Sequence, residues 1–543
     1  MEIQRRRTGA CLARASAFAC LLLAAAAATA ATAGPKPVES AAAEQAAPRF
    51  DVLEYRVEGN TSLPAVDIER AVYPHLGPEK TVEDVEKARQ SLERAYQKAG
   101  YLTVLVDIPE QKVESGVVRL RVTEGKVARL RVTGSRYYSA GYIRKSVPEL
   151  QEGSVPNFPQ VQEQLGQLAR TPDRKVTPVL RPGETPGTLD VELKVEDELP
   201  LHGSLELNNR QTPNTKPLRL SAFLRYDNLW QLGHSISLQY QTAPQETSQL
   251  QAYSGSYVLP VDQSGSVLAL YAVNSNSDVT ALGSTDVIGK GTILGARYVL
   301  PFRSMANYYH SLTVGIDHKD FDETVALGAD EFETPISYVP VIMEYRLSLT
   351  GEQRSHAGSI SLNAAPRGFF GNNDEEFESK RIGANSSYVY LRGDWRSEQR
   401  LGSTWAVVGR LAGQVASEPL ISNEQYAIGG ADSVRGYLEA EALGDNGLVG
   451  NLELRQALPL LGAFDGWVKS WEGLAFADAG AVRIVDAAPG QTNHYDFYSV
   501  GLGLRASGSR YWDAALDLAV PLHDGPETNE GDTRVLFSVA AKF

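Results

Sequence analysis

Residues 512–520 read WDAALDLAV and residues 534–543 read RVLFSVAAKF, and these two segments decide the fold. In the first segment, Leu516, Leu518 and Val520 occupy every second position, with small or acidic residues between them. The second segment alternates in the same way and ends on an aromatic residue. Because successive side chains of a β-strand point to opposite faces, each segment predicts a strand with one apolar and one polar face.

The same alternation runs back through the chain to residue 199. We count about sixteen such segments of roughly ten residues, separated by turns. The connections alternate between short ones, such as 228–233, and long ones, such as 366–383 and 416–445. The chain is therefore predicted to be β-dominated, with residues 199–543 forming an antiparallel transmembrane β-barrel of about 16 strands, apolar outside and polar inside. The alternative is a soluble β-sandwich, for which roughly 340 residues of uninterrupted meander is large.

Residues 1–33 predict a secretory signal peptide. A cluster of arginines precedes an apolar run at 15–28, and residues 31–33 (Ala-Thr-Ala) provide a small-x-small cleavage site. Both cysteines, Cys11 and Cys20, lie within this segment. The exported chain is therefore expected to form no disulfide and to be stabilised by burial alone.

Between the signal peptide and the alternating strands, the chain shows one mixed pattern twice. Residues 34–49 are rich in Ala, Pro and Glu and predict a flexible linker. Residues 50–124 follow the order strand, helix, helix, strand, strand, with a capping-box pattern at 81–84 before the second helix. Residues 125–198 repeat that order at similar length. The repetition predicts two small α+β (βααββ) domains in tandem, against the alternative of two unrelated α/β domains.

Two short motifs late in the chain resemble the signature of the two-partner secretion transporters (TpsB proteins, such as the haemolysin and filamentous haemagglutinin transporters). The motifs are Val434-Arg435-Gly436-Tyr437 and the alternating residues Phe476, Asp478 and Gly480. Asn228-Leu229 with Gly233 is similar to an early barrel motif of the family, although His234 stands where an Asp is usual. The resemblance covers nearly the whole exported chain. It implies that the repeated units are POTRA domains and that residues 416–445 form a lid loop inserted into the barrel.

Arg435 and Asp478 are expected to meet inside the barrel. An arginine in a water-filled lumen needs a partner, and the planar guanidinium matches a carboxylate with two hydrogen bonds. Asp478 faces inward if Ala477 and Ala479 face lipid. The alternative for Arg435 is a solvated loop charge.

The resemblance implies an outer-membrane transporter that secretes a partner exoprotein, with its POTRA domains in the periplasm. Such a protein binds the unfolded client at these domains and threads it through the barrel. Two alternatives stay open: an assembly or insertion factor of the same superfamily, and a passive porin or surface receptor. The further partners expected are outer-membrane lipid and the outer-membrane assembly machinery, with the barrel a monomer. The assembly signal is assigned to the alternating C-terminal residues Phe537, Val539, Ala541 and Phe543.

Other chemistries find little support in the sequence. Removing the signal peptide takes away four basic residues and one acidic residue, so the net charge moves from -14 to about -17, which argues against nucleic-acid binding. None of the eight histidines stands at metal-ligand spacing, and we expect no metal, no cofactor, no catalytic residues and no enzymatic activity. Acidic clusters at 374–376 and at Glu439 and Glu441 are expected to be solvated loop charges, against the alternative of cation binding at the cell surface.

Overall fold

The structure, a computed structural model, describes residues 49–543 except 114, 170, 263, 278, 283–284, 303–306, 323, 328–329, 460–466 and 509. The expected signal peptide and all of the expected linker but Arg49 lie outside the described residues. None of the described helices is long and apolar enough to cross a membrane.

The first α+β unit packs two helices on a three-stranded sheet. Its elements are β1 (Phe50–Val52), β2 (Glu54–Glu58), α1 (Ala65–Val72), η1 (Tyr73–His75), β3 (Gly77–Lys80), α2 (Val82–Lys98), β4 (Val104–Asp107) and β5 (Val117–Glu124). The sheet has the order β2-β5-β4, with β2 parallel and β4 antiparallel to β5. Helix α1 ends at Val72, because Pro74 has no N–H to continue the ladder and the chain tightens into η1.

The second unit repeats this topology. Its elements are β6 (Lys126–Thr133), α3 (Ala140–Lys145), η2 (Pro148–Leu150), α4 (Phe158–Leu168), β7 (Arg174–Pro182) and β8 (Thr188–Asp197). The sheet order β6-β8-β7 again pairs one parallel and one antiparallel neighbour with the last strand. Each unit has its own apolar core, centred on Leu92 and Leu120 in the first and on Ile143 and Leu193 in the second.

The remaining strands close into one antiparallel barrel. They are β9 (Leu201–Asn208), β10 (Arg219–Leu229), β11 (His234–Thr242), β12 (Gln251–Pro260), β13 (Val267–Ser275), β16 (Gly291–Pro301), β17 (Tyr308–Phe321), β20 (Ile336–Tyr338), β21 (Val341–Thr350), β22 (Arg354–Ala365), β23 (Tyr388–Leu401), β24 (Trp405–Ala416), β27 (Asn446–Leu458), β28 (Ser470–Arg483), β29 (His494–Ser507), β30 (Trp512–Pro521) and β31 (Arg534–Lys542). Both β20 and β21 pair with β17, so these two segments form one strand interrupted before Val341. Over the described residues the barrel therefore has sixteen strands, and β31 pairs with β9 to close it. This confirms the predicted barrel.

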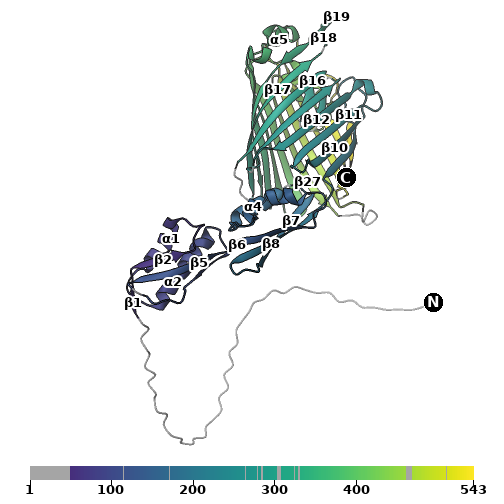
Figure 1. The fold of residues 1–543 in the computed structure, drawn as a ribbon. Helices are drawn as coiled ribbons and strands as arrows, with labels where there is room; N and C mark the ends of the chain where they lie inside the picture. Colours follow the sequence, from purple (N-terminus) through teal and green to yellow (C-terminus); the bar gives the residue numbers. More distant parts are fainter. Residues whose placement is uncertain are drawn as a thin grey trace, which may run out of the picture.

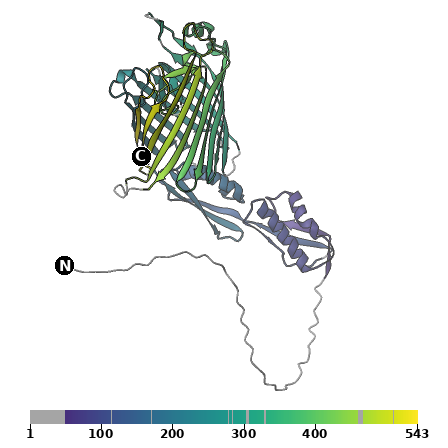
Figure 2. The ribbon, with the colours of Figure 1, turned by 180° about the vertical axis from the view of Figure 1, so that it is seen from behind.

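The connections at the two ends of the barrel differ in length, as the sequence predicts. Both α+β units lie at one end, below the short connections, with α4 near the barrel mouth (Figure 1). The opposite end carries the long connections, which contain the hairpins β14–β15 (Val279–Leu282, Thr285–Ile288) and β18–β19 (Thr324–Leu327, Asp330–Glu333) and the helix α5 (Asp374–Lys380). The view from behind shows the same arrangement (Figure 2).

The short turn after β10 holds the second α+β unit against the barrel rim. Ser139 N, at the start of α3, donates to Gln231 Oε1 at 2.7 Å, and Gln231 Nε2 donates to Tyr137 O at 2.9 Å. Asn228 has a φ of 65° and its side chain donates to Gln231 Oε1 at 2.9 Å. A Cβ on Gly233 would lie 2.8 Å from the Tyr142 hydroxyl, so this glycine allows the close approach. The unit next to the barrel is thus fixed by hydrogen bonds at its rim.

Candidate functional site

The long connection between β24 and β27 turns back into the barrel. It contains η5 (Ser422–Glu424) and a short hairpin of β25 (Tyr426–Ile428) and β26 (Ala442–Gly444). Apart from Ala416, which ends β24, it is the predicted lid loop. Its apolar residues pack on the inner faces of β27, β28 and β29 in one buried cluster: Ile428, Val434, Tyr437, Ala442, Val449, Val482 and Phe497.

The wall strand β28 alternates as the sequence predicts. Phe476, Asp478 and Gly480 are buried, whereas Ala477 and Ala479 between them are exposed on the outer face. The three motif residues therefore face the lumen, where the lid loop lies.

Arg435 of the lid loop meets Asp478 in a buried, two-pronged contact. Arg435 Nε donates to Asp478 Oδ2 at 2.7 Å and Nη2 donates to Oδ1 at 2.8 Å, while the backbone N–H of Arg435 also donates to Oδ2 at 3.2 Å. The side chains of Arg435 and Asp478 are 3% and 0% exposed, so the pair lies in a dry part of the lumen. The guanidinium carbon sits 3.5 Å from the centre of the Phe476 ring, a close cation–π contact. Alternation along β28 places Phe476 and Asp478 under the same guanidinium.

Val434 explains why a glycine stands at 480. A Cβ on Gly480 would lie 2.7 Å from Val434 Cγ2, closer than real Cβ contacts allow. The absence of a side chain at this position lets the lid loop approach the wall and bury Val434 completely.

Gly436 and Tyr437 complete the lid motif. Gly436 has a φ of 99°, a conformation that favours glycine, and it turns the chain between two buried side chains. The Tyr437 ring stacks on Phe497 of β29, with centroids 4.0 Å apart and planes 4° from parallel. Its hydroxyl donates to the carbonyl of His523 at 2.7 Å. Val434, Arg435 and Tyr437 thus each contact the wall through a different partner, and Gly436 supplies the backbone conformation that the turn between them needs.

A third charged residue, Glu453 of β27, shares Arg435. Arg435 Nη1 donates to Glu453 Oε1 at 2.8 Å, and Glu453 also accepts from Arg455 Nε at 2.8 Å. Asn451 Nδ2 donates to Asp478 Oδ1 at 2.9 Å. The expected simple pair is therefore a cluster. Glu453 and Asn451 point inward two residues apart on one strand, but no motif of the sequence marks them.

Two acidic residues that no sequence motif marks, Asp445 and Glu424, hold the base of the lid loop. Asp445 is fully buried and accepts from Arg381 Nη2 at 2.9 Å and from the backbone N–H groups of Leu420 at 2.8 Å and Val485 at 2.7 Å. Glu424 is 2% exposed and accepts from the hydroxyl of Tyr390 at 2.8 Å. Their partners lie in distant strands and loops, so sequence spacing carries no sign of them.

The solvated reading of the acidic lid residue Glu441 is wrong. Glu441 is 7% exposed, and its carboxylate accepts from the backbone N–H groups of Leu438 at 2.7 Å and Thr528 at 2.9 Å and from the Thr528 hydroxyl at 2.7 Å. The carboxylate ties the lid loop to the connection between β30 and β31. A buried carboxylate is tolerated here because hydrogen bonds replace its hydration.

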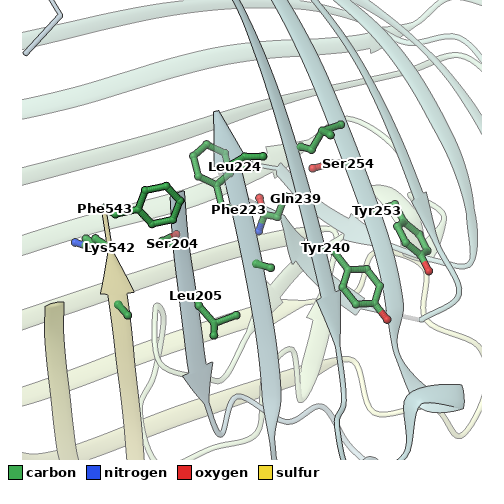
Figure 3. A pocket seen from close by; sticks show the side chains of 13 residues that line it. Ser204, Leu205, Phe223, Leu224, Gln239, Tyr240, Tyr253, Ser254, Lys542 and Phe543 are labelled. Carbon is green, nitrogen blue, oxygen red and sulfur yellow. The ribbon is translucent and has the colours of Figure 1, made fainter. Parts of the chain in front are cut away.

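The four predicted C-terminal residues lie elsewhere, at the seam where β31 meets β9. Val539 and Phe543 are 49% and 67% exposed, as lipid-facing residues of an isolated barrel are. A Cβ on Gly203 would lie 2.3 Å from the Phe543 ring, so the ring covers the glycine across the seam. Figure 3 shows Phe543 beside Ser204 and Leu205, at an apolar groove. Phe537 and Ala541 belong to the same strand. Among the described residues, the buried cluster between the lid loop and the wall contains none of the four.

Comparisons with known proteins agree with this architecture. A family model described as "Haemolysin secretion/activation protein ShlB/FhaC/HecB" matches residues 187–506, more than half of the chain, and one described as "POTRA domain, ShlB-type" matches residues 50–125. The chain is similar to the outer membrane transporter CdiB of Dickeya dadantii (strain 3937), with 23% identity over 76% of this chain and 74% of that protein. It is 21% identical to the heme/hemopexin transporter protein HuxB of Haemophilus influenzae (strain 86-028NP), over 82% of this chain and 79% of that protein. Among solved structures, CdiB from Escherichia coli has the same fold, with a TM-score of 0.67 and 18% identity over 94% of this chain and 93% of that chain.

Proposed function

Since the chain belongs to the ShlB/FhaC/HecB family of haemolysin secretion/activation proteins, we propose that it binds an unfolded exoprotein on its periplasmic domains and threads it through the barrel. It is an outer-membrane transporter of two-partner secretion, with POTRA domains in the periplasm. We assign 50–124 to the first POTRA domain, 125–198 to the second and 199–543 to the barrel. The observation that carries the proposal is the lid loop, whose Arg435 is held by Asp478 inside the barrel.

The binding step uses main-chain hydrogen bonds. In the two described POTRA sheets, β4 and β7 each pair with one neighbour and stand at the edge. An extended client segment adds to such an edge through its backbone, so the contact tolerates varied client side chains. An unfolded client is suited to this mode because its own backbone groups are not yet paired.

The threading step requires the lid loop to leave the lumen. Its anchors Arg435, Glu441 and Asp445 form charge-assisted hydrogen bonds, which a moving loop can exchange for water. No nucleotide motif is present in the sequence, so folding of the client outside the cell supplies the direction of transport. The chain acts as a channel rather than as an enzyme.

Biogenesis explains the C-terminal residues. Phe537, Val539, Ala541 and Phe543 form the assembly signal that the outer-membrane assembly machinery recognises before the barrel enters lipid. Pairing of β31 with β9 closes the barrel, so we expect the barrel to be stable as a monomer.

The test is secretion of a candidate exoprotein, taken from the reading frame next to the transporter gene. Both proteins are expressed together in a host that lacks relatives of either, and the exoprotein is assayed outside the cell and in the periplasm. We expect it outside only when the transporter is present, and we expect its N-terminal region to co-purify with the full-length transporter in detergent. Co-purification of outer-membrane barrel precursors in its place would favour an assembly factor, and transporter-independent secretion would favour a passive porin.

A further inference from the structure

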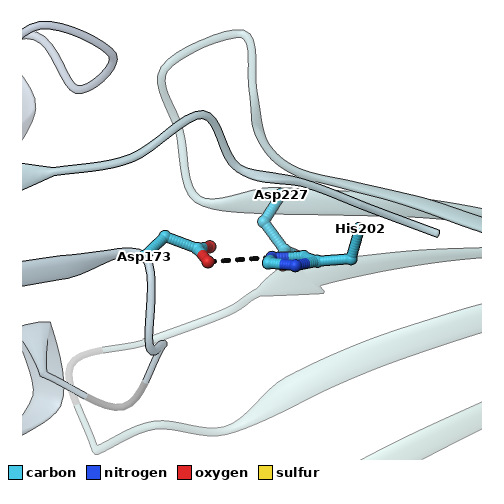
Figure 4. Close-up of side chains that lie close together, drawn as sticks. All are labelled: Asp173, His202 and Asp227. Carbon is cyan, nitrogen blue, oxygen red and sulfur yellow. Dashed lines mark ion pairs between the residues drawn. The ribbon is translucent and has the colours of Figure 1, made fainter. Parts of the chain in front are cut away.

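Three side chains capable of binding a metal ion meet between the second POTRA domain and the barrel rim. Asp173 comes from the turn before β7, His202 from the start of β9 and Asp227 from the end of β10. Figure 4 shows the Asp173 carboxylate and the imidazole facing each other from the two parts of the molecule, with Asp227 beside them.

The ligand atoms lie at the separations that one ion can bridge. His202 Nε2 is 2.8 Å from Asp173 Oδ1 and 3.7 Å from Asp227 Oδ2, and one ligand atom of each residue lies within 4.8 Å of the others. Two ligands of a tetrahedral zinc ion, each about 2.0–2.2 Å from the metal, are about 3.3–3.6 Å apart. The two separations from His202 Nε2, 2.8 and 3.7 Å, lie within about 0.5 Å of that range.

Two side-chain atoms of this cluster are buried without a hydrogen-bond partner among the described residues. Asp173 is 4% exposed, and its Oδ2 has no donor among the residues that the structure describes. His202 Nε2, despite its proximity to Asp173 Oδ1, forms no hydrogen bond of acceptable geometry within the same residues. A buried carboxylate oxygen left without a partner is costly, so nearly all such atoms in folded proteins find one. A cation between the imidazole and the carboxylates satisfies both.

The surroundings hold the carboxylates in place. Asp227 accepts from Arg225 Nε at 3.1 Å and from the Ser235 hydroxyl, and its own backbone N–H donates to Pro200 O at 2.8 Å. The carbonyl of Asp173 accepts from the N–H of Glu198 at 2.7 Å. Such outer hydrogen bonds orient ligands and strengthen metal binding.

The charge balance also admits a divalent cation. Asp173 and Asp227 bring two negative charges, and Arg225 offsets part of one of them through a single N–H from a side chain that is 41% exposed. Arg225 lowers the affinity for a cation but leaves the Asp173 carboxylate unpaired on one oxygen.

We propose that Asp173, His202 and Asp227 bind one first-row divalent transition-metal ion, of which Zn²⁺ is the representative, at the junction of the second POTRA domain and the barrel. One imidazole nitrogen and two carboxylate oxygens form a ligand set that suits such ions, and water fills the fourth position. Because one ligand belongs to the POTRA domain and two to the barrel, the ion pins the domain to the rim and restricts its swing beneath the barrel mouth. The site differs from the expectation of no metal, which is based on histidine spacing along the chain, because these three ligands come from separate segments.

The first experiment measures zinc binding to the purified full-length protein in detergent. The protein is stripped with EDTA, titrated with Zn²⁺ by calorimetry and analysed for bound metal after gel filtration. We expect one Zn²⁺ per chain, and none in His202→Ala or in the nearly isosteric Asp173→Asn. His234→Ala is the matched control, because His234 lies at the same end of the barrel and contacts Tyr257 rather than the cluster, so it keeps the zinc. Ser235→Ala should weaken binding about 10- to 100-fold.

The second experiment measures the pinning. Cysteines introduced for Glu184 and Ser403 carry spin labels on the second POTRA domain and on the rim turn between β23 and β24, and the predicted mature chain has no other cysteine. Zn²⁺ should narrow the distance distribution in the labelled protein but not in its His202→Ala variant. If bound Zn²⁺ leaves the distance distribution between the two spin labels unchanged, the ion does not pin the domain to the rim. Absence of stoichiometric zinc in a protein that migrates as a folded barrel overturns the site, and so does zinc retained in both ligand variants. His202 and Asp173 then contact each other directly, without an ion between them.

Discussion

Arg435→Ala should release the lid loop and reduce secretion without preventing insertion of the barrel. The substitution removes the two-pronged contact with Asp478 and the hydrogen bond to Glu453. The strand pairing of β27 and β28 is unaffected, because Arg435 belongs to the loop and not to the wall. The effect should therefore appear in the position of the loop rather than in the stability of the barrel.

The burial of Arg435 and Asp478 determines how much free energy of loop docking the substitution removes. An exposed pair would contribute up to about 1 kcal/mol. Here Arg435 and Asp478 are 3% and 0% exposed, and removing one partner of a buried pair costs about 3–5 kcal/mol. Asn451 still donates to Asp478, and Arg455 still donates to Glu453, so we take the lower end of that range. About 3 kcal/mol changes the ratio of docked to undocked loop by about two orders of magnitude.

Single-channel conductance in planar bilayers measures the loop position, and export of the neighbouring exoprotein measures function. Arg435→Ala should raise the fraction of time in a high-conductance state and lower export. Arg297→Ala is the matched control: Arg297 forms the same two-pronged contact with Asp317, at 2.6 and 2.7 Å, but between two wall strands. Arg435→Lys keeps the charge but loses the fork, and should fall between wild type and alanine.

Two results would refute this reasoning. If Arg297→Ala opens the channel as often as Arg435→Ala, the effect comes from lumen charge and not from the lid. If the Arg435→Ala and Asp478→Ala defects add up in the double variant, each residue acts alone, because partners in one contact should give a double variant little worse than the worse single.

Three further predictions concern Gly480 beneath the lid loop, Phe543 at the barrel seam and Glu124 in the first POTRA domain. Gly480→Leu should displace the lid, since even a Cβ would lie 2.7 Å from Val434, and limited proteolysis of the loop should become faster than in wild type. Deletion of Phe543 should slow assembly of the barrel, seen as a smaller heat-modifiable fraction on gels of pulse-labelled membranes. Glu124→Gln should destabilise the first POTRA domain by about 1–3 kcal/mol in thermal melts, since its carboxylate accepts from the backbone N–H groups of 61–62 at 2.8 Å. Burial tends to raise the pKa of Glu124, but these hydrogen bonds outweigh burial and lower the pKa. The stabilisation is therefore present at neutral pH and is lost as the pH falls through the lowered pKa. If the difference in stability between wild type and Glu124→Gln does not shrink in acid, this reasoning is contradicted.

The fold could be predicted from the sequence because each of its parts repeats a local pattern. Alternation with a period of two marks barrel strands such as β30 and β31, and the order of elements in residues 50–124 recurs in 125–198. Element ends were less predictable where proline intervened. The chain tightens into 3-10 turns at Pro74 and Pro148, after α1 and α3, and Pro340 lies in the interruption of the strand opposite β17.

Some residues of the candidate site could be predicted from local sequence patterns, and others could not. Arg435, Asp478 and Gly480 stand in contiguous motifs, so a resemblance and an alternation argument bring them to one place. Glu441 and Asp445 are single acidic residues of a polar loop, and their sequence surroundings are those of solvated charges. Only the inward course of the loop buries them beside N–H groups and arginines from distant segments. Such pairings depend on tertiary structure and leave no local pattern.

The chemistry of these anchors suits a loop that must be both well placed and removable. Apolar contacts, such as Val434 on Gly480 and Tyr437 on Phe497, fix where the loop docks. The ionic contact of Arg435 with Asp478 adds direction but little net free energy, because desolvation offsets much of the attraction between buried charges. A loop held by apolar contacts alone would either lack a single docked position or be unable to leave the lumen. A loop held by ion pairs is destabilised sharply once water or a client segment reaches the charges. The contact of Arg435 with Asp478 therefore contributes little net free energy to closing the channel in the intact protein, although removing either charge alone is expensive.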